Sequence, residues 1–595
     1  MTGSEYIAEF IARIGSRRVY TLTGGACAFM IDAIGRHPDL EVICVQNEQA
    51  AAMAADAVWR VERRVGVSMA TSGPGATNLI TGIACSFFDS IPSIHITGQV
   101  NQRESSSIHG AQVRQSGFQE TKIVDMVRPI TKYGVLVRSV EELKIELPKA
   151  YKIATSGRMG PVLIDVPMDV QQAEFDDDFP AFAEKAVGQA DTAHISEAVA
   201  AISAILRNAE RPVILWGGGV AMANAQRALS EWLDATGMPF VASWAGLSAF
   251  SHDHAGFVGQ IGVYGNRGAN FVLQNADAVI VLGSRLDNRQ RSGNAANFAM
   301  GAKIHVLDID GEEIRKYGGG RYTGTIIDLK ALPQILRELS APQLSEIWTS
   351  YVAEMKLTYS GGETSSTAKR LNSLSPYDVV RRIRDAIDRD AIVVGDTGAA
   401  LCWLHQSFTV DKHTLFTAGG NSPMGYALCA AIGAKLSSPE RQVISYNGDG
   451  GFQVNIQELQ TIKHLGLDVA IVVMNNSAYG IIKQFQDSYL GSRYTASSDG
   501  YSTPDFGAVA KAYGLDYCRV ENIDQITPEL FRRGAIVIDV ILSEETLIEP
   551  KLEMGRPIND QYPYLQKAEY ENGNRFVSYP RSPALEALIE RQARQ

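Results

Sequence analysis

Two short polar strings in the last third of the chain have the residue types of a phosphate site bridged by a divalent cation. Gly448-Asp449-Gly450 and Asn475-Asn476 lie 27 positions apart, and each follows an apolar run typical of a buried strand. The Asp449 carboxylate and the Asn476 amide offer the oxygen ligands that Mg²⁺ prefers and shares with phosphate oxygens. Glycines at 448, 450 and 451 leave room for a phosphate beside the backbone. The two strings therefore predict a diphosphate held through Mg²⁺.

The elements around these strings must bring them together. Residues 452–464 are predicted to form a helix between the two strands. Such a right-handed crossover places both strings at the carboxyl ends of neighbouring parallel strands, where α/β sheets bind ligands. The alternative is a pair of ordinary turns, because Asp-Gly and Asn-Asn are common turn formers.

Apolar strands alternate with helix-like stretches along the whole chain, which predicts α/β domains whose parallel sheets are covered on both faces. Polar stretches at 171–192 and 361–375 are typical of linkers. We expect three doubly wound parallel-sheet domains at 1–175, 190–340 and 373–545, followed by a tail at 546–595 with little regular pattern. The expected strands are 19–23, 42–45, 65–70, 93–97, 162–166, 213–216, 278–282, 303–308, 391–395, 443–447, 469–474 and 535–541.

Composition narrows the class of protein. The 595 residues carry a net charge of -11, which argues against a nucleic-acid partner. No apolar run reaches the ~18 residues of a membrane span, and the first residues lack the pattern of a secretory signal. The six cysteines are scattered without a Cys-x-x-Cys pair, which indicates reduced thiols in a cytoplasmic protein.

Further motifs in the first domain identify a family. Gly24-Gly25-Ala26 follows the first strand and Asn47-Glu48-Gln49 follows the second. Other matching segments are 70–79, 96–100, 118–121 and 160–167. With these motifs the chain resembles the thiamine diphosphate-dependent enzymes, and most closely the acetolactate (acetohydroxyacid) synthase large subunits. The resemblance covers about residues 5–545.

The resemblance assigns a catalytic role to Glu48. The family places a glutamate against the aminopyrimidine ring of the cofactor, where it promotes the tautomer that removes the thiazolium C2 proton. Alanines and a methionine at 50–55 indicate a dry site around it. The alternative is a glutamate that only favours the dipole of a helix N-terminus.

Three more catalytic positions follow from the resemblance. Met424 matches the bulky residue that bends the cofactor, although a core methionine is the alternative. Phe118 and Gln119 match residues that contact the bound intermediate, although Gln119 can also be a surface residue. The cofactor-binding positions are Gly25, Glu48, Pro74, Asn78, Gly398, Met424, Gly448, Asp449, Gly450, Gly451, Asn476, Ala478, Tyr479, Gly480 and Ile481, with Asp449, Asn476 and Ala478 as the Mg²⁺ ligands.

The middle domain resembles the flavin-holding domain of acetolactate synthases. FAD plays no redox part there, and several relatives keep the domain without flavin, so a flavin-free domain is the alternative. The matching positions are Gly217, Gly218, Gly219, Gly283, Arg285, Asp287 and Asp308.

The chain departs from the biosynthetic synthases at the substrate end of the site. The segment 101–117 is longer, Met168 replaces a lysine, Phe485 replaces a tryptophan linked to acceptor choice, and the tail differs. The cofactor-activating residues are unaffected.

We therefore expect a carboligase that decarboxylates pyruvate or a similar 2-keto acid and transfers the hydroxyethyl unit to a carbonyl acceptor. A keto-sugar nucleotide or other large acceptor is one alternative, with the tail as an active-site cover. A non-ligating decarboxylase or a flavin oxidase is another, but the candidate acids His109 and His405 form no clear pair. The family's site lies between subunits, which implies a homodimer or homotetramer.

Overall fold

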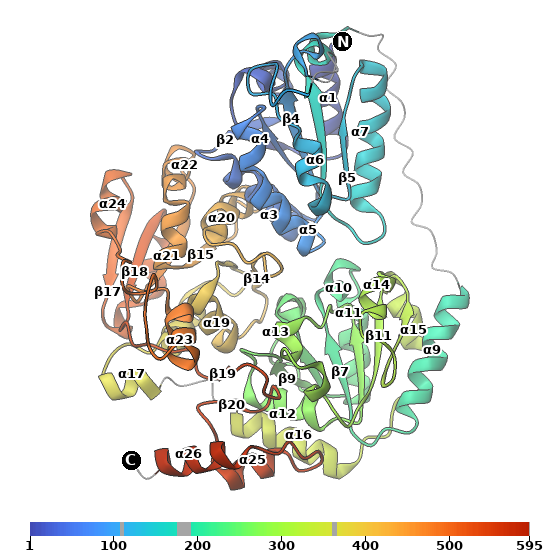
Figure 1. Ribbon diagram of the computed structural model, residues 1–595, viewed down its shortest axis with the longest axis vertical. Coiled ribbons are helices and arrows are strands. Elements are labelled where there is room, and N and C mark those ends of the chain that lie inside the picture. The colour runs from blue at the N-terminus through green and yellow to red at the C-terminus, as the bar shows by residue number, and fades with distance from the viewer. Residues whose placement is uncertain (107–111, 175–191, 360–365, 594–595) are drawn as a thin grey trace.

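The computed structural model describes residues 1–106, 112–174, 192–359 and 366–593, arranged as three α/β domains and a tail (Figure 1). The first domain is at the top of the view, the middle domain at the lower right and the last domain at the left. Each domain is built on a six-stranded sheet whose paired strands are parallel. The prediction of three doubly wound parallel-sheet domains is therefore confirmed.

The first and last sheets have the same strand order. It is β2-β1-β3-β4-β6-β5 in the first sheet and β14-β13-β15-β16-β18-β17 in the last, which match when strands are counted from the start of each domain. The strands of the first sheet are β1 (Arg18–Leu22), β2 (Glu41–Cys44), β3 (Gly66–Ala70), β4 (Ser93–Gln99), β5 (Tyr133–Leu136) and β6 (Val162–Pro167). Those of the last are β13 (Ile392–Gly395), β14 (Thr414–Phe416), β15 (Val443–Gly448), β16 (Val469–Asn475), β17 (Asp516–Val520) and β18 (Ile536–Ile541).

The middle sheet has the order typical of dinucleotide-binding domains, β12-β11-β10-β7-β8-β9. Its strands are β7 (Pro212–Trp216), β8 (Phe240–Ala242), β9 (Phe257–Gln260), β10 (Ala278–Leu282), β11 (Lys303–Asp308) and β12 (Tyr322–Ile326). In each sheet the chain adds strands first on one side of the domain's first strand and then on its other side, which creates a switch point. These switch points lie between β1 and β3, between β7 and β10, and between β13 and β15, and ligands of such sheets bind at their carboxyl ends.

Corresponding helices of the first and last domains pack against each other. Helix α3 (Glu48–Glu62) follows the second strand of its domain, as α20 (Tyr426–Ser437) does in the last domain. The Asn47 side chain caps α3 by accepting from the Gln49 backbone N–H. The contact is close enough to require glycine, because a Cβ at Gly433 would lie 2.2 Å from the Ala54 carbonyl oxygen. One apolar core therefore runs through both domains.

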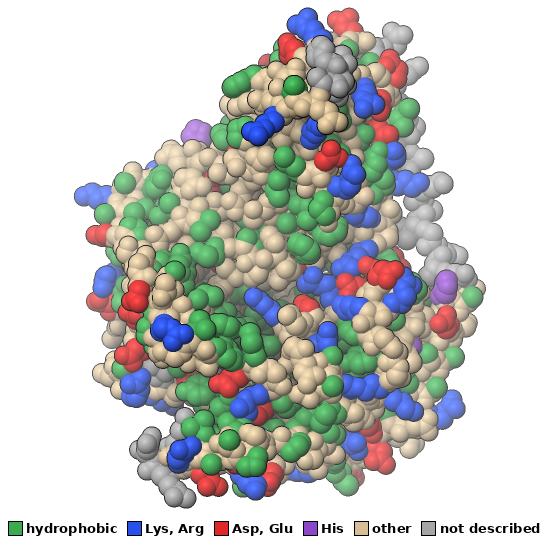
Figure 2. Space-filling model, in the orientation of Figure 1, with side chains coloured by type: hydrophobic (Ala, Val, Ile, Leu, Met, Phe, Trp, Pro, Cys, Tyr) green, Lys and Arg blue, Asp and Glu red, His purple; other side chains and the backbone are tan. Residues whose placement is uncertain are grey.

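Other helices surround the sheets and link the domains. They include α1 (Gly3–Arg13), α2 (Ala28–Arg36), α5 (Ile80–Phe88), α7 (Val140–Thr155), α9 (Thr192–Leu206), α11 (Gln226–Thr236), α12 (Arg267–Asn275), α14 (Gly311–Arg315), α15 (Leu332–Glu338), α16 (Glu346–Tyr359), α18 (Pro376–Ala386), α19 (Gly398–Ser407), α23 (Gly480–Tyr489) and α24 (Phe506–Ala512). No helix among the described residues is long and apolar enough to cross a membrane. Figure 2 shows basic and acidic side chains mixed around α14, where Arg158 pairs with Asp310 and Glu313 at 2.7 and 3.1 Å.

All twelve expected strands are present, but six further strands escaped prediction. They are β5, β8, β9, β12, β14 and β17. All except β8 lie at a sheet edge, and β8 has only three residues. The predicted helix 452–464 is divided at Asn455 into α21 (Asp449–Val454) and α22 (Leu459–His464). The Asn455 backbone leaves the helical region at φ -124° and ψ 30°, and its side chain donates to the Gly425 carbonyl at 3.1 Å.

The expectation of an irregular tail was wrong. Residues 551–593 form a hairpin, β19 (Lys551–Leu552) with β20 (Gln561–Tyr562), and two helices, α25 (Lys567–Gly573) and α26 (Pro583–Ala593). Buried Arg581 pairs with Asp560 at 2.7 Å and lies 3.7 Å from the centre of the Tyr570 ring. The Tyr351 hydroxyl of α16 donates to the Gly573 carbonyl, so the tail is anchored on the middle domain (Figure 1).

Candidate active site

The cavity in the last domain, of about 460 Å³, lies at the carboxyl ends of β13, β15 and β16. Every cofactor-binding residue that was predicted in this domain lines it. These are Gly398, Met424, Gly448, Asp449, Gly450, Gly451, Asn476, Ala478, Tyr479, Gly480 and Ile481. The two polar strings therefore meet at the switch point of the sheet, as their spacing predicted.

Asp449 and Asn476 present buried atoms without partners to this cavity. One Asp449 oxygen, Oδ1, accepts from the Gly450 backbone N–H at 2.6 Å and the Tyr501 hydroxyl at 3.0 Å. Among the described residues, Oδ2 of Asp449 and Nδ2 of Asn476 have no hydrogen-bond partner. Burial raises the pKa of Asp449 to about 6, although hydrogen bonds work against it. An unpaired buried carboxylate oxygen beside an amide fits a bound cation.

The glycines of the cavity are required by close packing. A Cβ at Gly450 would lie 2.3 Å from the Tyr479 ring and 3.3 Å from the Met424 methyl carbon. A Cβ at Gly451 would lie 1.8 Å from Oδ2 of Asp396. The Met424 methyl group therefore lies close to the glycine turn.

Asp396 lines the same cavity and was not predicted. It follows β13 at the switch point and accepts from the Ala427 backbone N–H at 3.2 Å. Burial raises its pKa to about 6, and its Oδ2 lacks a partner among the described residues. The signal was present in Asp396-Thr397-Gly398, a polar turn after a buried strand, which is the pattern that identified Asp449.

Glu48 lies in the first domain, at the first position of α3. It is 5% exposed, and its carboxylate accepts from the Asn78 amide at 2.9 Å. Asn78 ends the short helix α4 (Pro74–Asn78), and a Cβ at Gly75 would lie 3.1 Å from the other Glu48 oxygen. Glu48 thus lies at a helix N-terminus, but it is buried and hydrogen-bonded rather than solvated.

Gln119 lies beside the same turn in a constrained conformation. Its φ is +63°, and a Cβ at Gly73 would come within 2.8 Å of the Gln119 Cβ. Phe118 is 84% exposed, and Gly25 lies in an exposed loop after β1. These residues, with Pro74 and Asn78, gather near the carboxyl ends of the first sheet.

Glu120 holds the segment before it in place. Its carboxylate accepts from the hydroxyls of Ser105 and Ser106 and from the backbone N–H of Ser116, all within 2.9 Å. Burial opposes ionisation, but these hydrogen bonds lower the pKa of Glu120 to about 2. The predicted acid His109 lies outside the described residues.

The two halves of the predicted site do not meet within one chain. None of the predicted site residues of the first domain lines the cavity that holds Asp449. These residues are Glu48, Gln119, Phe118, Pro74, Asn78 and Gly25. The resemblance implied a site shared between subunits, and this stays a prediction.

A second cavity, of about 280 Å³, opens where the three domains meet. Of the seven positions matched to flavin binding, six line it: Gly218, Gly219, Gly283, Arg285, Asp287 and Asp308. Gly217 does not, because it packs against Gly283, where a Cβ would lie 2.2 Å from the carbonyl oxygen. Further cations of the wall are Arg60, Arg63, Arg158, Arg289 and Lys330.

His405 belongs to this middle cavity, not to the cavity of Asp449. Its ring stacks on Trp244 with 4.9 Å between centres, and burial lowers its pKa to about 4. It is therefore neutral near pH 7, and Trp244, on which it stacks, lines both cavities. Met168, Phe485 and the described part of the tail line neither cavity.

Three family profiles match consecutive parts of the chain. They describe the N-terminal TPP binding domain (residues 1–126), the central domain (199–336) and the C-terminal TPP binding domain (396–540) of thiamine pyrophosphate enzymes. The chain belongs to the family of thiamine pyrophosphate enzymes.

Curated relatives cover nearly the whole of this thiamine pyrophosphate enzyme. The acetolactate synthase isozyme 1 large subunit of Escherichia coli K12 is 34% identical over 563 residues, 93% of this chain and 96% of the relative. An acetolactate synthase of Mycobacterium leprae is 32% identical, over 93% and 89% of the two chains. A probable acetolactate synthase large subunit of Methanocaldococcus jannaschii is 33% identical, over 89% of each. The enzyme is therefore of the acetolactate synthase type.

Proposed function

We propose that this enzyme is a thiamine diphosphate- and Mg²⁺-dependent carboligase. It decarboxylates pyruvate, or a similar 2-keto acid, and transfers the hydroxyethyl unit to a carbonyl acceptor. The observation that carries the proposal is the unpaired, buried Asp449 carboxylate oxygen beside Asn476 in a glycine-lined cavity. The names of the acetolactate synthase relatives support the donor and the ligation step.

The last domain binds the cofactor. Asp449, Asn476 and the Ala478 backbone would supply oxygens to hold Mg²⁺. The glycines at 448, 450 and 451 would allow the diphosphate to approach the backbone, and Met424, close to Gly450, would support the cofactor. When bound, thiamine diphosphate supplies the electron sink that decarboxylation of a 2-keto acid requires.

The first domain handles protons and the substrate. Glu48, held by Asn78 and shielded from water, would share a proton with the aminopyrimidine ring of a bound cofactor. Gln119 and Phe118, beside the Gly73-Pro74-Gly75 turn, contact the reacting carbon chain. Glu120 supports them because it fixes the segment that precedes them.

Two copies of the chain build each complete site. Glu48 and Asp449 share no cavity within one chain, so the first domain of one copy must face the last domain of its partner. The 84% exposure of Phe118, beside Gln119, fits a surface that a partner covers. A homodimer is the minimum assembly, and a tetramer is two such pairs.

The middle cavity binds FAD in a structural role. Gly218, Gly219 and Gly283 allow a dinucleotide to approach the switch point of the sheet. Arg285 and its neighbouring cations balance a diphosphate, while Trp244 and Phe416 offer ring surfaces. His405, neutral and stacked, supplies no acid for a redox step.

A product assay tests the proposal. The purified chain with thiamine diphosphate and Mg²⁺ is given pyruvate together with 2-keto acids, aldehydes or keto-sugars as acceptors. Acetolactate or another ligated product is expected, and chelation of the metal should abolish it. Acetaldehyde as the sole product would refute ligation, and acetate with peroxide would indicate an oxidase. The acceptor that competes best with a second pyruvate identifies the substrate class.

A further inference from the structure

One short segment, residues 417–424, forms a wall of both cavities. Thr417 and Gly419 line the middle cavity, and Asn421, Ser422 and Met424 line the cavity of Asp449. The segment connects β14 to α20, and Gly420 lies at its centre. Gly420 therefore joins the end of the segment that lines one cavity to the end that lines the other. Trp244 and Arg289 also line both cavities.

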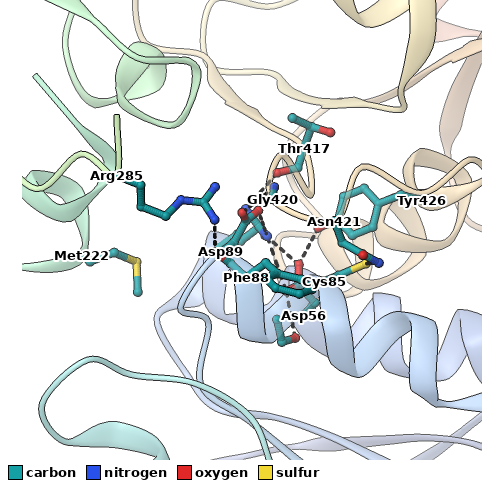
Figure 3. A network of polar contacts seen from close by, with 12 residues as sticks. Asp56, Cys85, Phe88, Asp89, Met222, Arg285, Thr417, Gly420, Asn421 and Tyr426 are labelled. Carbon is teal, nitrogen blue, oxygen red and sulfur yellow. Dashed lines mark hydrogen bonds and ion pairs between the residues drawn. The ribbon is translucent and has the colours of Figure 1, made fainter. Parts of the chain in front are cut away.

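Asp89, in the first domain, accepts a hydrogen bond from Gly420 at the centre of the segment (Figure 3). Its Oδ1 accepts from the Gly420 backbone N–H at 2.8 Å, and its Oδ2 accepts from Nη2 of Arg60 at 2.9 Å. There is no spare room, because a Cβ at Gly420 would lie 2.6 Å from the Phe88 Cβ. Asp89 also lines the middle cavity, so a ligand there meets the side chain that holds Gly420.

Arg60 holds the same segment at its start. It donates to the Thr417 carbonyl at 3.1 Å and to Asp56 at 2.6 Å, and it too lines the middle cavity. Asp56 is fully buried and also accepts from the Ser86 and Tyr426 hydroxyls. The contact with Asp56 therefore holds Arg60 against the protein core, and Arg60 also lines the middle cavity.

Other contacts complete the link between the domains. The Asn421 amide donates to the Thr81 carbonyl of α5 at 3.4 Å, and Arg285 of the middle domain donates to the Phe88 carbonyl at 3.0 Å. All three domains thus meet around residues 88–89 (Figure 3).

We propose that Arg60 and Asp89 are positioning residues that couple occupancy of the middle cavity to binding of thiamine diphosphate. A dinucleotide in the cavity restricts these two side chains, which then fix Thr417 and Gly420 and, through them, Met424. The cofactor enters a site whose wall is already ordered, so its binding loses less conformational entropy. This inference rests on the cofactor and flavin sites proposed above.

Thermodynamic linkage gives a test that needs no variant. If FAD tightens thiamine diphosphate binding by some factor, thiamine diphosphate must tighten FAD binding by the same factor. Each ligand is titrated into the full-length protein with Mg²⁺, with and without the other, by calorimetry. We expect a factor on the order of tenfold in both directions. A protein that binds FAD without any change in thiamine diphosphate affinity overturns the coupling alone, while one that does not bind FAD overturns the flavin site as well.

Asp89→Asn tests the assigned residues. Asparagine keeps the size but replaces one acceptor oxygen with a donor, so it cannot hold both Gly420 and Arg60. Both ligands should still bind, and the coupling factor should fall towards one. Asp310→Asn is the matched control, because Asp310 pairs with Arg158 of the cavity wall at 2.7 Å and, among the described residues, has no hydrogen bond to residues 417–424. An unchanged factor in Asp89→Asn would refute the assignment.

Gly420→Ala is a second variant that tests the same link. The added methyl group must displace the segment from Phe88 and Asp89, so the coupling factor should again fall while FAD affinity changes little. If either variant does not fold, the other decides the assignment. In every case, the reciprocal titrations of the wild-type protein decide whether the two sites are coupled.

Discussion

The first and last domains share one strand order but carry different chemistry at the same points of the sheet. After the second strand, the first domain places Glu48 at the start of α3, whereas the last domain places the segment 417–424 before α20. After the third strand, the first domain has a Gly-Pro-Gly turn and the last has Gly448-Asp449. The shared fold determines where a ligand can bind, and in the function proposed above the side chains divide the work into proton handling and cofactor binding. Four changes test this division.

The largest effect is expected from Glu48→Gln. Glutamine keeps the hydrogen bond with Asn78 but cannot exchange a proton, so kcat should fall about 10²–10⁴-fold. The affinity for thiamine diphosphate should change little, since the last domain binds it. Steady-state kinetics and calorimetry separate the two quantities, and Glu62→Gln at the other end of α3 is the control. Equal losses in kcat and affinity would break the division of roles.

Asp449→Asn should lower the affinity for the cofactor rather than kcat alone. It removes the charge that faces the cation, so cofactor affinity should fall by at least the ~10–100-fold seen for residues around metal ligands. Excess Mg²⁺ should recover part of the activity. Titration of cofactor at several Mg²⁺ concentrations measures the shift, with Asp505→Asn, at the N-cap of α24, as the control. A fall in kcat alone, at unchanged affinity, would contradict the assignment.

Gly433→Ala tests the contact between α3 and α20. The added Cβ would lie 2.2 Å from the Ala54 carbonyl, and such overpacking typically costs about 1–3 kcal/mol. Thermal unfolding should show a lower Tm. Gly35→Ala on α2, where a Cβ meets nothing, is the control. An unchanged Tm would mean that the two domains are less tightly joined than the structure indicates.

Glu458→Gln is expected to have the smallest effect, on pH dependence. Burial raises the pKa of Glu458 to about 7, although it accepts from Gln46 of the first domain and from Thr461. The folded state therefore binds a proton that the unfolded state has lost, and stability rises as pH falls from about 7 towards 4.5. The variant should lose about 1–2 kcal/mol of this rise. Tm measured from about pH 7.5 to about pH 5 checks it; parallel curves for the two proteins would contradict the prediction.

The sequence was sufficient where a strand is buried on both faces. Continuous apolar runs such as 278–282 predicted the central strands with small errors at their ends. Edge strands such as β12 and β17 have one buried residue each and are otherwise partly or fully exposed, so that criterion could not detect them. The same limit applies to the tail, whose short helices depend on packing against α16 rather than on their own periodicity.

The residues of the Asp449 cavity differ in how visible they are in the sequence. Asp449 and Asn476 were recognised because each follows a strand at a glycine-rich or turn-forming string. Asp396 has the same setting but was passed over, since only its neighbour Gly398 matched the family. The contacts of Asp89 and Arg60 with residues 417–424 join segments more than 300 positions apart, and no local pattern predicts them.

Because Glu48 and Asp449 lie in different domains, mutations of these two residues are expected to complement each other genetically. A chain damaged only at Glu48 keeps a sound last domain, and a chain damaged only at Asp449 keeps a sound first domain. In the proposed dimer of one chain of each kind, one interface would bring the two sound domains together, so co-expression should restore turnover that neither chain has alone. Loss-of-function alleles of this gene should then fall into two complementation groups, divided by the domain that carries the lesion.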